Sequence, residues 1–209
     1  MIVKRVLMVM ALIVLMTVQG VAAVPSPTEQ LRGAVDRIIE LLRDNGQPED
    51  EVLQEITRLV RSKFDFVAMS QSTLGVNWRH ATREQQQRFV RLFSQLLEDT
   101  YRERVAAYSY GDEYVEYVGE RILGSRAEVQ TIIVANKNIP VAYRMRLRGE
   151  EWLVYDVVIE EVSLVGNYRG SYARIIQNEG FDGLLSRMEE RIRELAKSDG
   201  TKPAESDAP

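Results

Sequence analysis

Few side chains in this sequence could perform acid–base or nucleophilic chemistry. The chain contains one histidine, His80, and no cysteine, so a Ser-His-Asp triad would have to use His80, and no nucleophile-elbow motif accompanies it. His80 lies between Arg79 and an expected helix cap at Thr82, which predicts a surface residue. The best candidates for a buried catalytic acid are Asp112 and Asp156. Asp156, the one charge inside an apolar stretch, is interpreted more simply as an acceptor for nearby backbone or hydroxyl groups.

The sequence also lacks the common motifs for cofactors and metals. Residues 166–171 do not have the lysine or the spacing of a phosphate-binding loop. There is no dinucleotide-binding fingerprint and no zinc-ligand spacing. The formal net charge of −4 makes nucleic acid an unfavourable partner. We therefore expect no metal ion, no cofactor, no nucleic-acid partner and no enzymatic activity.

The most regular charged pattern lies in residues 139–148. Apolar and arginine positions alternate there: Val141, Tyr143, Met145 and Leu147 with Ala142, Arg144, Arg146 and Arg148. In a strand this alternation places the apolar residues on one face and the three arginines on the other. Three arginines on one face of an acidic protein could dock it onto partner proteins. Pairing with acids of a neighbouring strand, such as Glu116 or Glu120, is an equally good interpretation.

Four consecutive segments rich in β-branched and aromatic residues predict an antiparallel meander. Short turns separate these segments, which are residues 115–123, 127–135, 139–147 and 152–159. The last segment is apolar on both faces, so we expect a strand that is covered on both sides. An even register after Leu147 would place Trp152, Val154 and Val158 on the apolar face of the third strand.

Helical periodicity accounts for most of the remaining chain. Helices are expected over residues 28–42, from Pro48 onwards, in short pieces within 64–82, from a Thr82–Gln85 capping box to about Tyr108, over 162–176 and after Gly183. Expected caps are Asp65 and Ser70 for the short helices, and Ser163 or Asn167 for the helix after Glu161. The predicted fold class is α+β: a four-stranded antiparallel meander packed against several helices stacked on one face. Folds of this NTF2-like or cystatin-like kind can leave a pocket between sheet and helices.

Both ends of the chain are predicted to lie outside the folded domain. Lys4 and Arg5, an apolar run over 6–18 and the small residues 21–23 match a secretory signal peptide. The run is shorter than the ~20 residues that span a bilayer. We expect residues 1–23 to be removed after Ala23, residues 24–197 to form a single domain, and residues 198–209 to be a disordered tail.

Several motifs, in order, resemble the MlaC-like proteins, also called toluene-tolerance auxiliary components. The motifs are FDFVAMSQSTLGVNWRHAT at 64–82, EQQQRFVRLFSQLLEDTY at 84–101, WLVYDVVIE at 152–160, VSLVGNYR at 162–169 and GFDGLL at 180–185. The resemblance spans nearly all of residues 28–190. Glu161 departs from the family pattern, where glycine is expected, and this leaves the turn after the strand open.

The resemblance implies a periplasmic phospholipid carrier of Gram-negative bacteria. Such a carrier shuttles lipid between the outer and inner membranes and maintains the lipid asymmetry of the outer membrane. Bound phospholipid is its cargo, and it is expected to be a monomer. Its expected partners are an inner-membrane MCE-domain ABC transporter complex, for which it is an auxiliary component, and an outer-membrane lipoprotein–porin complex. Arg144, Arg146 and Arg148 are the candidate docking residues.

The family's cargo also suggests which apolar residues could line a lipid pocket. Candidate lipid-contacting residues are Trp78, Phe93, Leu97, Tyr101, Tyr143, Met145, Tyr155, Val157, Val165 and Tyr168. Each could equally belong to an ordinary hydrophobic core. Two other functions remain open at this point: an NTF2-like enzyme acting on a small apolar substrate through Asp156 or Asp112, and a purely structural adaptor.

Overall fold

The structure, a computed structural model, describes residues 24–44, 50–106 and 113–199. Five predictions concern residues outside these ranges: the signal peptide, the helix start at Pro48, the helix end near Tyr108, Asp112 and the tail from residue 200. The last helix runs to Asp199, so it includes two residues that the sequence assigned to the tail.

The predicted antiparallel meander is confirmed. Its strands are β1 (Tyr114–Leu123), β2 (Arg126–Val134), β3 (Ile139–Arg148) and β4 (Glu151–Ile159). A short fifth strand, β5 (Val162–Ser163), pairs with the end of β4, and the sheet order is β1-β2-β3-β4-β5. The tight turn after β1 contains Gly124 at φ 60°, and the turn after β3 contains Gly149 at φ 61°. Glycine adopts this left-handed conformation at little cost, which explains its place in both turns.

A β-bulge in β4 changes which residues face α2. Leu147 pairs with Trp152 and Met145 with Val154, as an even register requires, but Tyr143 then pairs with Val157. The extra residue, Tyr155, reverses the alternation beyond it. The prediction that Val158 shares the apolar face was therefore wrong, because Val158 pairs with Ala142 on the opposite face.

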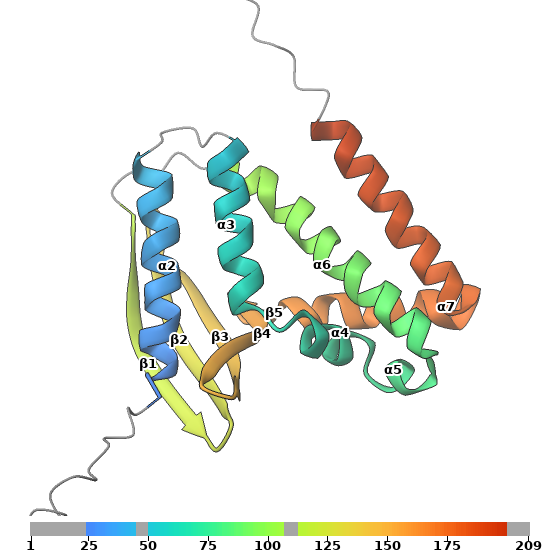
Figure 1. Ribbon diagram of the computed structural model, residues 1–209, viewed down its shortest axis with the longest axis horizontal. Coiled ribbons are helices and arrows are strands. Elements are labelled where there is room, and N and C mark those ends of the chain that lie inside the picture. The colour runs from blue at the N-terminus through green and yellow to red at the C-terminus, as the bar shows by residue number, and fades with distance from the viewer. Residues whose placement is uncertain (1–23, 45–49, 107–112, 200–209) are drawn as a thin grey trace, which may run out of the picture.

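Two N-terminal helices lie next to the sheet. Helix α2 (Pro27–Asp44) contacts β1, β2 and β4, and helix α3 (Asp50–Lys63) packs beside α2 (Figure 1). The apolar face of the sheet and Leu31 of α2 bury a set of residues that we call the sheet cluster: Leu31, Ala127, Val129, Val141, Met145, Trp152, Val154 and Val157. A smaller set, Leu41, Leu42 and Ile56, joins α2 to α3.

The remaining helices form a bundle at the β4 edge of the sheet. They are α4 (Phe66–Leu74), α5 (Val76–His80), α6 (Arg83–Ala106) and α7 (Leu164–Asp199). The predicted capping box opens α6, because Gln85 N–H donates to Thr82 Oγ1 and the Gln85 side chain accepts from Thr82 N–H. Gly180, at φ 75° and ψ 177°, kinks α7 into two helical halves, close to the break expected before Gly183.

The position of this bundle corrects the expectation that all helices stack on one face. Backbone N–H of Asp65 donates to Val154 O at 2.8 Å, which attaches the start of α4 to the β4 edge. Helix α7 starts directly after β5 at the same edge (Figure 1). Both helices therefore begin beside the sheet and not above it. Strand β4 is covered on both sides, as predicted, with α2 on one face and α4 and α7 at the other.

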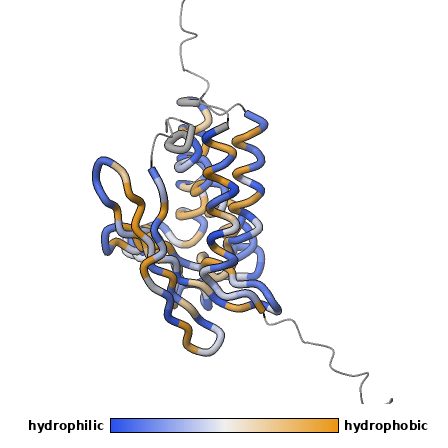
Figure 2. Tube along the Cα trace, turned by 90° about the vertical axis from the view of Figure 1, so that its left-hand side faces the viewer, coloured by the Kyte–Doolittle hydropathy of each residue, from blue (hydrophilic) through white to orange (hydrophobic). Residues whose placement is uncertain are grey.

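The bundle buries its own set of residues, which we call the helical cluster. Its buried members are Met69, Leu74, Phe89, Phe93, Leu96, Leu97, Val165, Tyr172, Leu184, Leu185, Met188 and Ile192. The rings of Phe89 and Phe93 are stacked at 5.4 Å, and Tyr172 meets both edge-on. The prediction that Ser70 caps a short helix was wrong, because Ser70 lies inside α4 and is fully buried. Figure 2 shows the hydrophobic positions of the helices facing inwards.

The turn between β4 and β5 explains why glycine is expected at position 161. Glu160 has φ 47° and Glu161 has φ 69°, the only positive-φ residues other than glycine among those described. A side chain in this conformation is strained, whereas glycine is not. The Glu160 carboxylate also forms an ion pair with Lys137. The turn therefore forms with glutamate in place of glycine at position 161, at the cost of some backbone strain.

Candidate functional site

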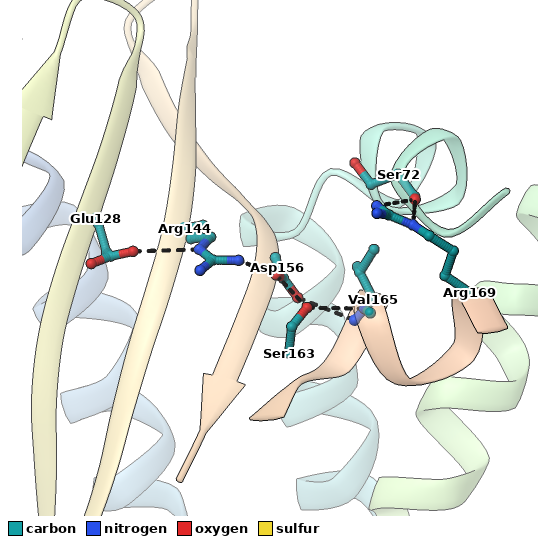
Figure 3. Close-up of polar contacts among 8 residues, drawn as sticks. Ser72, Glu128, Arg144, Asp156, Ser163, Val165 and Arg169 are labelled. Carbon is teal, nitrogen blue, oxygen red and sulfur yellow. Dashed lines mark hydrogen bonds and ion pairs between the residues drawn. The ribbon is translucent and has the colours of Figure 1, made fainter. Parts of the chain in front are cut away.

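Asp156 is the centre of a network that joins the sheet to α7 (Figure 3). Its side chain is 6% exposed. Its carboxylate accepts from Arg144 Nη1 at 3.0 Å, from the Ser163 hydroxyl at 2.7 Å and from Val165 N–H at 3.1 Å. Ser163 Oγ also accepts from Gly166 N–H at 2.9 Å, which confirms Ser163 as a cap of α7. The prediction that Asp156 hydrogen-bonds nearby backbone and hydroxyl groups is confirmed.

Asp65 plays the equivalent part at the start of α4. Its Oδ1 accepts from Ala68 N–H at 2.9 Å, which confirms it as the N-cap of that helix. Its Oδ2 forms ion pairs with Arg146 Nε at 2.6 Å and with Arg148 Nε at 3.0 Å. The Asp65 side chain is 6% exposed, so a buried carboxylate is neutralised by two guanidinium groups from one strand.

The three arginines of β3 are therefore engaged with acids of the protein itself. Arg144 also approaches Glu128 at 3.4 Å. The partners are Asp65, Asp156 and Glu128, so the expected pairing with acids is found, but not with Glu116 or Glu120. Parts of these guanidiniums still face solvent, because the side chains of Arg144 and Arg148 are 42% and 54% exposed. Their part in docking stays a prediction.

The ten candidate lipid-contacting residues fall into two separate groups. Phe93, Leu97 and Val165 belong to the helical cluster, and Trp78, Tyr101, Tyr155 and Tyr168 pack against it. The other three, Tyr143, Met145 and Val157, belong to the sheet cluster or pack against it. Phe64 contacts both clusters. The ten side chains thus do not form one continuous wall, and their role in binding lipid stays a prediction.

Tyr143 differs from its neighbours in the sheet cluster. It keeps part of its surface accessible, whereas Met145 on the same strand is 1% exposed. Burial nevertheless raises the pKa of the Tyr143 phenol. Tyr143 is therefore largely desolvated without being fully buried.

Sequence reasoning missed a second tyrosine on this face. Burial raises the pKa of Tyr117, whose ring stacks under the Arg32 guanidinium at 4.1 Å. The Tyr117 hydroxyl is buried and has no hydrogen-bond partner among the described residues. Buried hydroxyls are normally paired, so Tyr117 departs from the usual pattern, as the Tyr172 hydroxyl of the helical cluster also does. The alternation of Val115 and Tyr117 with Glu116 was the only signal that could have found it.

The described residues offer little for catalysis. His80 is exposed, as predicted. No cluster of three or more potential metal ligands occurs within residues 24–44, 50–106 and 113–199. In the same ranges no helix has both the length and the apolar character needed to cross a bilayer. The lone pairs of Asp156 are occupied by three donors, which makes it a structural acid.

Comparison with known proteins assigns the family. The family profile described as "MlaC protein" matches residues 32–190, well over half of the chain. The chain belongs to the MlaC family. A curated relative from Haemophilus influenzae, the "Intermembrane phospholipid transport system binding protein MlaC", is 27% identical over 124 residues, which are 56% of this chain and 57% of the relative. The match thus spans little more than half of that protein.

Two further members of this comparison cover more of the chain. The "Toluene tolerance protein ttg2D" of Pseudomonas putida is 26% identical over 175 residues, 77% of each chain. A solved structure, the phospholipid-binding protein from Ralstonia solanacearum in complex with a phospholipid, superposes with a TM-score of 0.70. It is 27% identical and is matched over 97% of its length and 80% of this chain. The resemblance to MlaC-like proteins and the α+β fold are confirmed.

Replacing Asp156 by alanine should destabilise the protein by about 2–4 kcal/mol, because Arg144, Ser163 and Val165 N–H lose a buried acceptor together. Urea denaturation measures this loss. Glu40→Ala is the control: its exposed ion pair with Arg37 should matter by no more than about 0.5 kcal/mol. Equal stability of the two variants would contradict a structural role for Asp156.

Proposed function

We propose that this protein is a periplasmic phospholipid carrier that moves lipid between the outer and inner membranes and so maintains outer-membrane lipid asymmetry. The observation that carries this proposal is the likeness to the Ralstonia protein, which is matched over 97% of its length and holds a phospholipid. The names of the two curated relatives, one a phospholipid transport binding protein, support it.

A carrier is needed because water is a poor solvent for acyl chains. At ~0.8 kcal/mol per methylene, about thirty methylenes of a diacyl lipid would cost ~24 kcal/mol to expose to water. A protein that encloses the chains removes most of this cost. The headgroup can remain hydrated and needs few specific contacts.

We place the acyl chains between the α2-facing side of the sheet and helices α2 and α3. Tyr143 supports this position, since it is desolvated and yet retains accessible surface. Ile133 and Ile139, which pack against the same sheet cluster, are also only partly buried. The α2–α3 set is likewise bordered by the partly buried Ile38, Leu59 and Val60. The unpaired Tyr117 hydroxyl on the same face could bind an ester or phosphate oxygen of the lipid.

An NTF2-like enzyme is the less favoured alternative. It would need a buried acid free to exchange a proton, and Asp156 is held by three donors. Asp65 is held by a backbone amide and two arginines. Neither of these two acids is therefore free to exchange a proton.

We further propose that the carrier works as a single domain, residues 24–197, released into the periplasm after cleavage of residues 1–23. Its proposed partners are an inner-membrane MCE-domain transport complex and an outer-membrane lipoprotein–porin complex. The solvent-facing parts of Arg144 and Arg148 are suited to steering it onto acidic surfaces of such partners.

The protein should purify with diacyl phospholipid bound, near one lipid per chain, because an empty apolar space forfeits dispersion contacts along its walls. Lipid extraction and mass spectrometry measure the content. Tyr143→Glu should lose the lipid and keep the fold by circular dichroism, since the accessible part of this side chain lets water reach a carboxylate in the empty protein, whereas acyl chains beside it would not.

Met145→Asp is the matched control for this variant. Met145 is on the same strand but fully buried in the sheet cluster, so its replacement should unfold the protein. Wild-type protein that is free of lipid and melts cooperatively would count against the carrier. Unfolding of both variants would place Tyr143 in an ordinary core.

Arg148→Gln should weaken binding to isolated partner domains while leaving the fold intact, because Arg146 still neutralises Asp65. Surface plasmon resonance at low and physiological salt measures this effect. Unchanged affinity for both partners would remove Arg148 from the docking surface.

The exported protein should begin at Val24, because the small residues 21–23 satisfy the cleavage pattern. Its intact mass is the measurement. A mass that includes residues 1–23 would make the protein tethered instead of diffusing.

A further inference from the structure

The tip of the β1–β2 hairpin exposes apolar side chains that the lipid-carrying proposal does not use. Leu123 is 73% exposed and Ile122 is 49% exposed, and these residues end β1. The hairpin forms the lower extremity of the sheet in Figure 1, and Figure 2 shows hydrophobic colour reaching that end. The described residues leave these two large apolar side chains largely uncovered, so the tip is available to another surface.

The tip is rigid enough to present these side chains. Two residues, Gly124 and Ser125, connect β1 to β2, and Gly124 has φ 60°. The Ser125 carbonyl accepts from Leu147 N–H at 2.9 Å, which fixes the turn to β3. The conformational entropy that the turn loses on binding a surface would therefore be small.

Cationic side chains flank the apolar tip on both strands. Arg121 of β1 and Arg126 of β2 are exposed, and neither has an ion pair or side-chain hydrogen bond within the described residues. With Arg144 and Leu123 they line a surface hollow of about 140 Å³. That volume equals a few water molecules, and the hollow is open to solvent, so a phosphate group has room to lie in it.

The acids near this hollow are already engaged. Glu128, which also lines it, approaches Arg144 at 3.4 Å and accepts from Gln130 at 3.3 Å. Glu120 accepts from Thr28 N–H at 2.8 Å. Arg144 is already paired with Asp156 and Glu128, so Arg121 and Arg126 are the two guanidinium groups of the hollow that have no acidic partner among the described residues. They stand out in a chain whose formal net charge is −4. This asymmetry would turn the tip towards a negative surface.

We propose that the β1–β2 tip is a contact site for an anionic phospholipid membrane. Leu123 and Ile122 enter the interfacial region, and Arg121 and Arg126 bind lipid phosphates at the surface. A two-residue turn offers too little area for a stable protein interface, which needs about 1,000 Å², whereas insertion of a few side chains is enough for reversible membrane contact. This inference does not depend on whether the protein carries lipid.

The sequence makes a site-specific test straightforward, because it contains no cysteine. Leu123→Cys can carry a single environment-sensitive fluorophore, and Val76→Cys, at a residue 62% exposed on α5, is the matched control. Mixing with vesicles of phosphatidylethanolamine and phosphatidylglycerol should shift the emission to the blue at position 123 and leave position 76 unchanged. Vesicles of phosphatidylcholine alone should produce a much smaller shift.

Flotation of unlabelled protein with the same vesicles tests the charges. Arg121→Gln/Arg126→Gln should weaken binding by about tenfold or more, and so should Leu123→Asp. Arg79→Gln/Arg193→Gln removes the same charge from exposed positions elsewhere and should bind like the wild type. Absence of wild-type binding at low salt, equal binding by the tip variants, or capture of a protein and not lipid by a photocrosslinker at position 123 would overturn the proposal.

Discussion

The structure depends on the neutralisation of two buried carboxylates by one strand. Asp65 accepts a backbone N–H at the start of α4, and Asp156 accepts one at the start of α7. Both carboxylates form ion pairs with arginines from the same face of β3. A buried carboxylate without such partners would be strongly destabilising. The two helices can therefore begin only where β3 supplies its arginines, and this fixes the bundle against the β4 edge of the sheet.

This arrangement separates the molecule into regions with different tasks. The helical cluster is filled by the Phe89, Phe93 and Tyr172 rings and acts as a solid support. The opposite side of the sheet carries Tyr143 and Tyr117, which are desolvated but incompletely packed or paired. The bundle is thus attached at one edge of the sheet, and the α2-facing side keeps these two tyrosines only partly buried.

Local sequence patterns predicted most helices and strands, but they did not predict contacts between residues that are far apart in the sequence. The alternation in residues 139–148, the Asp65 cap and the Thr82–Gln85 box depend on neighbours within a few residues, so the sequence displays them. The bulge at Tyr155 was invisible because β4 is apolar on both faces, and a shift of one residue leaves its composition unchanged. The partners of Arg146 and Arg148 lie some eighty residues earlier in the chain, and no periodicity encodes that distance. For the same reason the sequence identified apolar candidates for lipid contact but not the cluster that each one joins, and the structure divides them between two clusters.

The most direct test of the account is the position of the acyl chains. A crystal structure with a phospholipid brominated along its acyl chains would locate them by anomalous scattering. The account predicts bromine peaks next to Tyr143, between the sheet and helices α2 and α3. Peaks confined to the helical cluster around Phe93, or to the outer surface of the protein, would contradict it.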